Sequence, residues 1–189
     1  MARSTELGNV VAEVLGIRPT TAASHVRNLR EAGLLTKTGR GITGAHMSPR
    51  DAAHLLIAAT CSQDVQDSVE TVHRYWKLRG GAVTEDFFPA LAALGEQHTF
   101  ADVLATLLDA PSIQFLAADP KSTVFVTLNY PNPEVLLEVS TRGGEKERPY
   151  TLPWPRKTKT FAHVGDRRVR YTFSEQTIFT VGNLLRGDD

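Results

Sequence analysis

Apolar residues recur at helical spacing along the first 32 residues of the chain. A helix is expected over 5–15, because its apolar side chains fall on one face: Leu7, Val10, Val11, Val14 and Leu15. Gly16 ends this helix. A second helix is expected over 19–32, with Pro19 tolerated in its first turn and Gly33 ending it. The pattern predicts two short helices joined by a tight turn.

Two short apolar runs follow the second helix. Residues 34–38 and 42–47 flank a sequence with two glycines, Gly39-Arg40-Gly41, and we expect them to form a small hairpin, or wing. Ser48 then opens a third helix. It can cap that helix, with proline at the first position and Asp51 in the positive first turn.

The middle of the chain is expected to be helical. One apolar stripe recurs at steps of four, three and four residues, formed by Val65, Val69, Val72 and Trp76. Thr84 and Thr99 are expected to cap two further helices. The stripe is a candidate surface for dimerisation, and burial in the protein's own core is the alternative.

Beyond Pro111 the apolar period changes from helical to strand-like. Strands are expected over 113–117, 124–129, 135–140, 160–164 and 168–173. The polar, proline-containing stretch 141–159 is expected to be a long loop or an edge excursion. Gly165-Asp166 suits a hairpin turn, and a final helix is expected from Ser174 to Leu185.

These elements predict an α+β fold. It consists of an N-terminal winged helix-turn-helix, a helical middle, and a C-terminal antiparallel sheet with a terminal helix. The expected boundaries are 1–47 for the winged module, 48–110 for a helical linker or dimerisation region, and 111–189 for the β-rich part.

The composition is that of a soluble globular protein, with 41% hydrophobic and 22% charged residues. No apolar run is long enough to span a bilayer and no signal-peptide pattern is present, so we expect a cytoplasmic protein without membrane contact. The single cysteine, Cys61, cannot form an intramolecular disulfide, which agrees with a reducing compartment. It lies in an apolar helical stretch, where we expect a small buried hydrophobe.

The chain has no net charge, but the charge is unevenly distributed. Residues 1–50 carry seven basic and three acidic side chains, a net charge of +4. Residues 51–141 carry a net charge of −8, and residues 142–189 again +4. The positive N-terminal part is therefore the part expected to face phosphates.

The segment from Val11 to Leu35 has three features that two steeply crossing helices require: a small residue at the crossing, a tight turn and apolar anchors. Ala12 is small where the helices are expected to cross, Gly16 allows the tight turn, and the second helix has apolar anchors at Ile17, Ala22, Val26 and Leu29. The segment resembles the winged helix-turn-helix regulators of bacteria, especially the MarR-like and GntR-like groups. Residues 29–35 are similar to the junction between the recognition helix and the first wing strand in those families.

This resemblance covers about residues 6–47, a quarter of the chain. It implies that the chain binds double-stranded DNA and that the second helix reads the bases. Those families place another helix before the pair, whereas only residues 1–4 precede it here. The helix that opens at Ser48 is expected to complete the bundle instead. The wing is also short.

The second helix carries short polar side chains, spaced so that they are expected to lie on its solvent-facing side. We expect base contacts from Thr20, Thr21, Ser24, His25 and Asn28. Basic side chains around this face are expected to contact phosphates: Arg18, Arg27, Arg30, Lys37 and Arg40. The alternatives are that the arginines only solvate the helix and that His25 packs at the edge of the core.

The function expected from these residues is that of a sequence-specific transcription regulator, such as a repressor, which binds a palindromic operator as a homodimer. The alternative is a component of a DNA-processing assembly, such as a phage packaging or replication adaptor. A third possibility is a module that binds only protein. The C-terminal part could receive a protein partner or sense a ligand.

Motifs for catalysis or for cofactors were not found in the sequence. The six histidines lack metal-ligand spacing, and there is no phosphate-binding glycine loop and no nucleophile elbow. We therefore expect no enzyme, no metal and no cofactor. A basic cluster over 156–170 could extend a DNA footprint or receive an acidic partner, but its alternation is more typical of a solvated strand face.

Overall fold

Helices and strands follow the hydrophobic periods of the sequence along most of the chain. The computed structural model describes residues 2–37, 46–80, 89–95, 97–109, 112, 114, 118, 121, 123–143, 146–154 and 169–187. In chain order the elements are α1 (Ser4–Leu15), α2 (Pro19–Glu31), α3 (Pro49–Cys61), the 3-10 helix η1 (Val65–Asp67), α4 (Ser68–Tyr75), α5 (Pro89–Ala92), α6 (Phe100–Leu107), β1 (Thr123–Tyr130), β2 (Glu134–Gly143), β3 (Lys146–Trp154), β4 (Val169–Ser174) and α8 (Glu175–Arg186). The predicted α+β class and the terminal helix after the strands are confirmed.

The first two helices are joined by a turn of three residues. Gly16 adopts the left-handed conformation with φ of 64°, which favours glycine, and the Ile17 amide donates to the Ala12 carbonyl at 3.0 Å. The helices approach each other closely at Gly8, where a Cβ atom would lie 3.2 Å from Cγ2 of Val26. Gly8 is therefore a point of close approach between the helices, and Ala12, for which the sequence predicts this role, is also buried.

Helix α3 lies at the centre of the helical layer. Every residue from Asp51 to Ala58 is buried, so the helix presents no solvated face over this stretch. Its predicted start is confirmed: Ser48 and Asp51 form a capping box, with Pro49 in the first turn. α3 packs against α1 and α2, as expected for the helix that completes the bundle, and also against α4 and α6.

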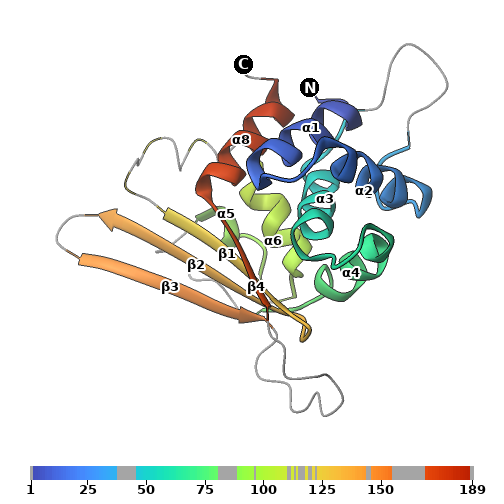
Figure 1. Ribbon diagram of the computed structural model, residues 1–189. Coiled ribbons are helices and arrows are strands. Elements are labelled where there is room, and N and C mark those ends of the chain that lie inside the picture. Colours follow the sequence, from blue (N-terminus) through green and yellow to red (C-terminus); the bar gives the residue numbers. More distant parts are fainter. Residues whose placement is uncertain are drawn as a thin grey trace.

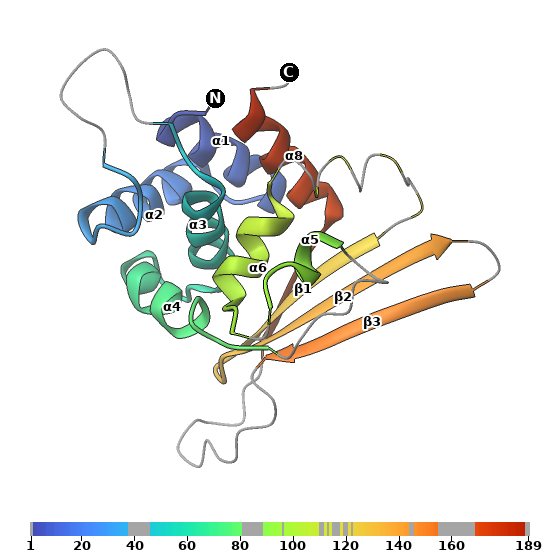
Figure 2. The ribbon, with the colours of Figure 1, turned by 180° about the vertical axis from the view of Figure 1, so that it is seen from behind.

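The C-terminal helix α8 packs against α1. The two helices lie side by side in both ribbon views (Figure 1, Figure 2), although α1 begins at Ser4 and α8 ends at Arg186. α8 therefore covers a flank of the α1–α2 pair. Buried residues from all three predicted segments belong to one continuous hydrophobic cluster.

The sheet is antiparallel and has the strand order β3-β2-β1-β4. Alternate residues of β1 and β2 are buried and lie opposite one another, in the pairs Val124–Val139, Val126–Leu137 and Leu128–Val135. Glu175 at the start of α8 accepts a hydrogen bond from the Val124 amide at 3.1 Å. In Figure 2, α5 lies in front of the sheet, and α6 lies between the sheet and α3.

The apolar stripe in the middle of the chain packs inward. Val72 is fully buried, and Val69 and Trp76 are half-buried against the hydrophobic cluster. Three of the four residues of the stripe thus pack in the protein's own core, which was the alternative to a dimer surface. The Tyr75 hydroxyl donates to the Asn129 carbonyl at 2.6 Å and links α4 to β1.

Several expected elements differ or fall outside the described residues. The wing is not confirmed: residues 34–37, 46 and 47 belong to no strand, and residues 38–45 lie outside the description. Gln114 is helical, so the strand over 113–117 is wrong at its one described residue. The strand 160–164, its hairpin turn and Thr84 also lie outside the description.

The stretch 141–159 is not a long loop, because it contains the edge strand β3. Pro149 and Pro153 lie opposite Ser140 and Leu136 of β2. Proline cannot donate a main-chain hydrogen bond, but an edge strand has a free side on which no donor is required. The prolines therefore mark an edge position rather than the absence of a strand.

Asp51 and Asp102 are both capping residues, and we expect the loss of Asp51 to reduce the stability of the protein more. The buried carboxylate of Asp51 accepts hydrogen bonds from the amide and hydroxyl of both Ser48 and Thr36, at 2.7–2.8 Å. Among the hydrogen bonds described, the Asp102 carboxylate accepts only from the amide and hydroxyl of Thr99, at the start of α6. Asp51→Ala should lower the free energy of unfolding by roughly 2–4 kcal/mol, and Asp102→Ala by about 1 kcal/mol. Urea unfolding of both variants tests this; equal losses would contradict it.

Candidate nucleic-acid interface

Helix α2 is held on three sides and open on the fourth. α1, α3 and the η1–α4 segment contact it, and the predicted anchors Ala22, Val26 and Leu29 are buried. The open side carries the exposed residues Thr20, Ala23, Arg27 and Glu31. We call these four residues, together with the half-buried Thr21 and Ser24, the open face of α2.

Three of the five expected base-contacting residues lie on this open face. Thr20 is exposed, whereas Thr21 and Ser24 are half-buried. The Ser24 hydroxyl donates to the Thr20 carbonyl one turn earlier, at 2.9 Å. A hydroxyl bonded in this way keeps its oxygen available as an acceptor. Thr20 and Ser24 therefore form a small polar surface in the N-terminal half of the helix.

The expectation that His25 and Asn28 face outward is wrong. His25 is only 3% exposed, and its Nδ1 lies 2.8 Å from the Ser68 hydroxyl at the start of α4. The Asn28 amide donates to the Val65 carbonyl of η1 at 2.8 Å. Both side chains therefore satisfy polar groups of the η1–α4 segment, which lies against this side of α2.

The hydrogen bonds of Ser68 show which ring nitrogen of His25 carries a proton. The Ser68 hydroxyl donates to the Val65 carbonyl, so the hydrogen bond between His25 and Ser68 requires a proton on Nδ1. Burial lowers the pKa of His25 below 6.5, and the nearby Asp64 carboxylate offsets only part of this. His25 is thus a neutral residue of the packing interface.

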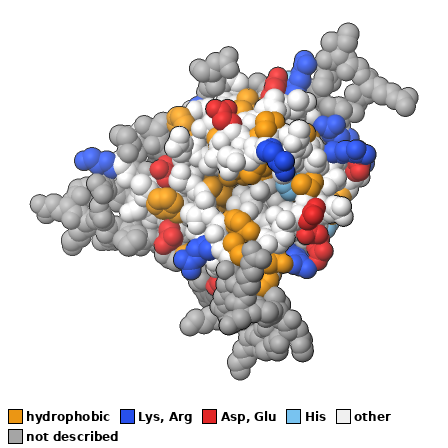
Figure 3. Space-filling model, viewed as in Figure 1, with side chains coloured by type: hydrophobic (Ala, Val, Ile, Leu, Met, Phe, Trp, Pro, Cys, Tyr) orange, Lys and Arg blue, Asp and Glu red, His pale blue; other side chains and the backbone are white. Residues whose placement is uncertain are grey.

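The η1–α4 segment places acidic side chains next to α2. Asp64, Asp67 and Glu70 are exposed, and Glu70 is paired with Arg74. Figure 3 shows basic side chains gathered over α2 and acidic side chains beside them over η1 and α4. A polyanion would be repelled by the acidic flank and attracted by the basic one.

The expected phosphate contacts occupy different environments. Arg18 and Lys37 are exposed near the two ends of α2. Arg27 is exposed and pairs with Glu31 at 2.8 Å, a surface contact that a stronger anion can replace at little cost. Arg30 is half-buried and donates to the Ser4 hydroxyl. Arg40 lies outside the described residues.

Helix α1 contributes polar residues that the sequence analysis did not select. A groove of about 210 Å³ runs between α1 and α2, with Thr5 and Asn9 on one side and Arg27 and Arg30 on the other. Thr5 and Asn9 are exposed and lie four residues apart, on one face of α1. Their spacing of four residues is the signal in the sequence that marks them as a shared polar face of α1.

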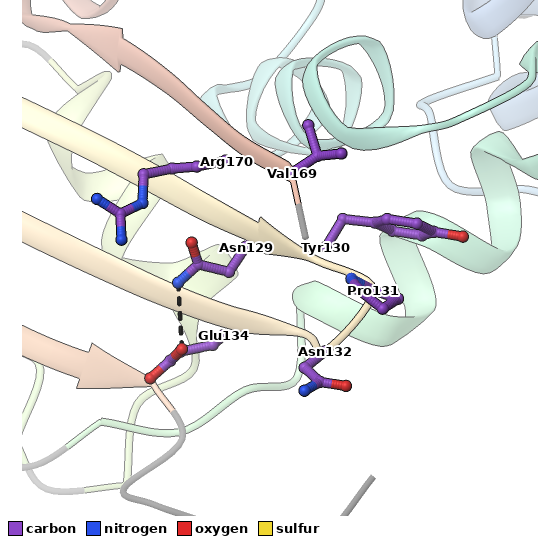
Figure 4. A pocket seen from close by; sticks show the side chains of 7 residues that line it. All are labelled: Asn129, Tyr130, Pro131, Asn132, Glu134, Val169 and Arg170. Atoms are coloured by element: carbon purple, nitrogen blue, oxygen red, sulfur yellow. Dashed lines mark hydrogen bonds between the residues drawn. The ribbon is translucent and has the colours of Figure 1, made fainter. Parts of the chain in front are cut away.

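A second cavity, of about 340 Å³, lies between the β1–β2 turn and the start of β4 (Figure 4). Asn129 donates to Glu134 at 3.1 Å, and the guanidinium of Arg170 lies near Asn129. The side chain of Tyr130 points to the opposite side of the sheet. With one arginine and one glutamate, this lining favours neither an anion nor a cation.

Other reactive or metal-binding groups do not gather in the described part of the chain. Among those residues no group of three His, Cys, Asp or Glu side chains could hold a metal ion. Burial raises the pKa of the Cys61 thiol to about 11, so it is protonated at neutral pH. None of the described helices is long and apolar enough to cross a membrane.

Stability should fall in mild acid because two histidines are buried in the neutral form. Burial lowers the pKa of both His25 and His54 below 6.5, and Arg50 contributes to the shift at His54. Below about pH 6.5 these two histidines bind fewer protons in the folded chain than in the unfolded chain, so stability present at pH 7 is lost as the pH falls. By pH 5 the loss should reach up to about 2 kcal/mol for each histidine.

Urea unfolding between pH 7 and pH 5 measures this loss. His25→Asn, whose amide can still donate to Ser68, should reduce the dependence on pH. Ser68→Ala is the matched control: it removes the hydrogen bond but keeps the histidine, so the dependence should persist. A wild-type stability that stays constant over this window would contradict the explanation.

The open face of α2 therefore combines a polar N-terminal surface with cations at both ends and an acidic border on one side. These features lie on a helix that α1, α3 and α4 hold in a fixed position. Comparison of the chain with models of protein families, with curated proteins and with solved structures found no match.

Proposed function

We propose that the chain binds double-stranded DNA through the open face of α2 and acts as a sequence-specific transcription regulator. The observation that carries the proposal is the juxtaposition of Thr20, Thr21 and Ser24 with the exposed cations Arg18 and Arg27 on one rigidly held helix. Short hydroxyl side chains can contact base edges, and arginines can contact phosphates on either side.

The dimensions of α2 suit the major groove. A helix of 13 residues is about 20 Å long, and the groove of B-DNA admits a helix across its width of about 12 Å. The three-residue turn after α1 leaves the N-terminal end of α2 exposed at Arg18, Pro19 and Thr20. This end is where recognition helices of helix-turn-helix proteins contact bases.

Electrostatics supports one direction of approach. The acidic side chains of η1 and α4 border the open face on one flank, so a duplex is favoured on the flank formed by α1 and its groove. Thr5 and Asn9 of α1 then become candidates for additional phosphate contacts. His25 and Asn28 are not part of the proposed reading surface, because η1 and α4 engage both side chains.

A homodimer on a palindromic operator is part of the proposal. Two copies related by a two-fold axis would place their α2 helices about 34 Å apart, one turn of the duplex. The inward-packed stripe of α4 does not supply the contact surface, and we assign none.

The proposal predicts that two pairs of substitutions have separable effects on DNA binding. Thr20→Ala with Ser24→Ala should lower the preference for a selected genomic fragment by tenfold or more, while the salt-dependent background remains. Arg18→Ala with Arg27→Ala should weaken binding to all fragments, and the slope of log K against log salt should fall by about 2. Titrations at low and moderate salt measure both effects.

Lys121→Ala with Arg170→Ala is the matched control. It also removes two positive charges, but from an exposed turn before β1 and from an exposed position of β4 rather than from α2. Binding should stay close to that of the wild type. If no fragment binds even at low salt, the α1–α2 unit is not a DNA-binding surface, and a module that binds protein becomes the better interpretation.

A further inference from the structure

A third cavity lies where the chain leaves α2. It has a volume of about 600 Å³, larger than the groove between α1 and α2 or the cavity at the end of the sheet. Residues 33–37 form one wall, the first turns of α3 form the second, and Trp76 after α4 closes the third side. We call it the corner cavity.

The walls of the corner cavity are fixed by hydrogen bonds between them. Nδ1 of His54 donates to the Leu34 carbonyl at 2.8 Å, and Asp51 accepts from the amide and hydroxyl of Thr36, each at 2.8 Å. The segment that follows α2 is thereby tied to α3 at two points. The cavity is thus formed by the fold itself, as ligand sites usually are.

Two cations stand at the rim of the corner cavity. Arg50 and Lys37 are exposed, and both line it. The guanidinium of Arg50 lies 5.5 Å from the ring centroid of Trp76, a cation–π contact that limits its orientation. An arginine held in this way loses little freedom when it binds a carboxylate or phosphate with two hydrogen bonds.

The acidic side chains near Arg50 accept hydrogen bonds from other residues of the protein. Asp51 is the one acidic residue among those described as lining the cavity, and its two oxygens accept from Ser48 and Thr36. Partial burial of Asp102 raises its pKa, but the hydrogen bonds from Thr99 outweigh this and lower it, with a smaller contribution from the charge of Arg50. The lining also has an apolar part, formed by Leu34, Leu35 and the half-buried Trp76.

We propose that the corner cavity binds a small organic anion: a carboxylate or phosphate carried on an apolar body. Arg50 binds the anionic group, Lys37 adds a second positive charge, and the apolar body lies against Leu34 and Trp76. A free phosphate would leave the apolar wall unused, and a neutral apolar molecule would leave both cations unused. The site does not depend on whether the chain binds DNA.

The fluorescence of Trp76 gives a direct test in the full chain without DNA. The chain has two tryptophans, so Trp154→Phe makes Trp76 the single reporter. Hexanoate should change the fluorescence in a saturable way, and the uncharged hexanamide should bind at least tenfold more weakly. Inorganic phosphate should also bind at least tenfold more weakly than hexanoate.

Variants separate this site from general anion binding at the surface. Arg50→Gln and Lys37→Gln should each weaken hexanoate binding fivefold or more. Arg18→Gln, which removes an exposed arginine outside the cavity, should leave it unchanged. The proposal is overturned if hexanoate gives no saturable change, if hexanamide or phosphate binds as tightly, or if neither cavity variant alters binding. Because no DNA is present, this result is independent of the DNA-binding proposal.

Discussion

The burial of α3 on all sides is the constraint on which the rest of the structure depends. A helix with no solvated face over Asp51–Ala58 needs neighbours in every direction, and α1, α2, α4, α6 and α8 supply them. Burial of its apolar side chains contributes on the order of 1.5–3 kcal/mol for each large residue. The two polar residues at its start, Asp51 and His54, bind the segment that leaves α2. The same helix therefore organises the core, holds the candidate reading helix and forms a wall of the corner cavity.

Local signals in the sequence predicted most of the elements. The capping boxes at Ser48 and Thr99 correctly marked the starts of α3 and α6, because a side chain three residues away completes the hydrogen bonds of the first turn. Alternating apolar residues identified β1 and β2, whose buried side chains lie opposite one another. For the stretch that contains β3, the prolines left two alternatives open, a long loop or an excursion at the edge of the sheet, and the structure agrees with the edge position. An edge strand tolerates them, but the edge position depends on pairing that a local pattern does not show.

The candidate site was predicted less completely, for a physical reason. Short polar residues at helical spacing can face solvent or the polar main chain of a neighbouring element. The same residue types suit both environments. Thr20 and Ser24 take the first role, whereas Asn28 takes the second at the Val65 carbonyl. The segment that covers Asn28 is 37 residues further along the chain, so no local pattern distinguishes the two roles. The acidic border of α2 could not be predicted for the same reason, because the acidic residues of η1 and α4 lie next to α2 only in the folded protein.

The contact between α1 and α8 has a consequence for how the molecule is assembled. The α1–α2 pair is synthesised before α8, yet α8 covers one flank of α1. Contacts between such distant parts of a chain form late and slow the folding of a domain. An α1–α2 pair transferred to another protein without α8 would leave this flank of α1 uncovered. Its packing is completed from the opposite end of the sequence, so any change that loosens α8 also loosens the helix pair.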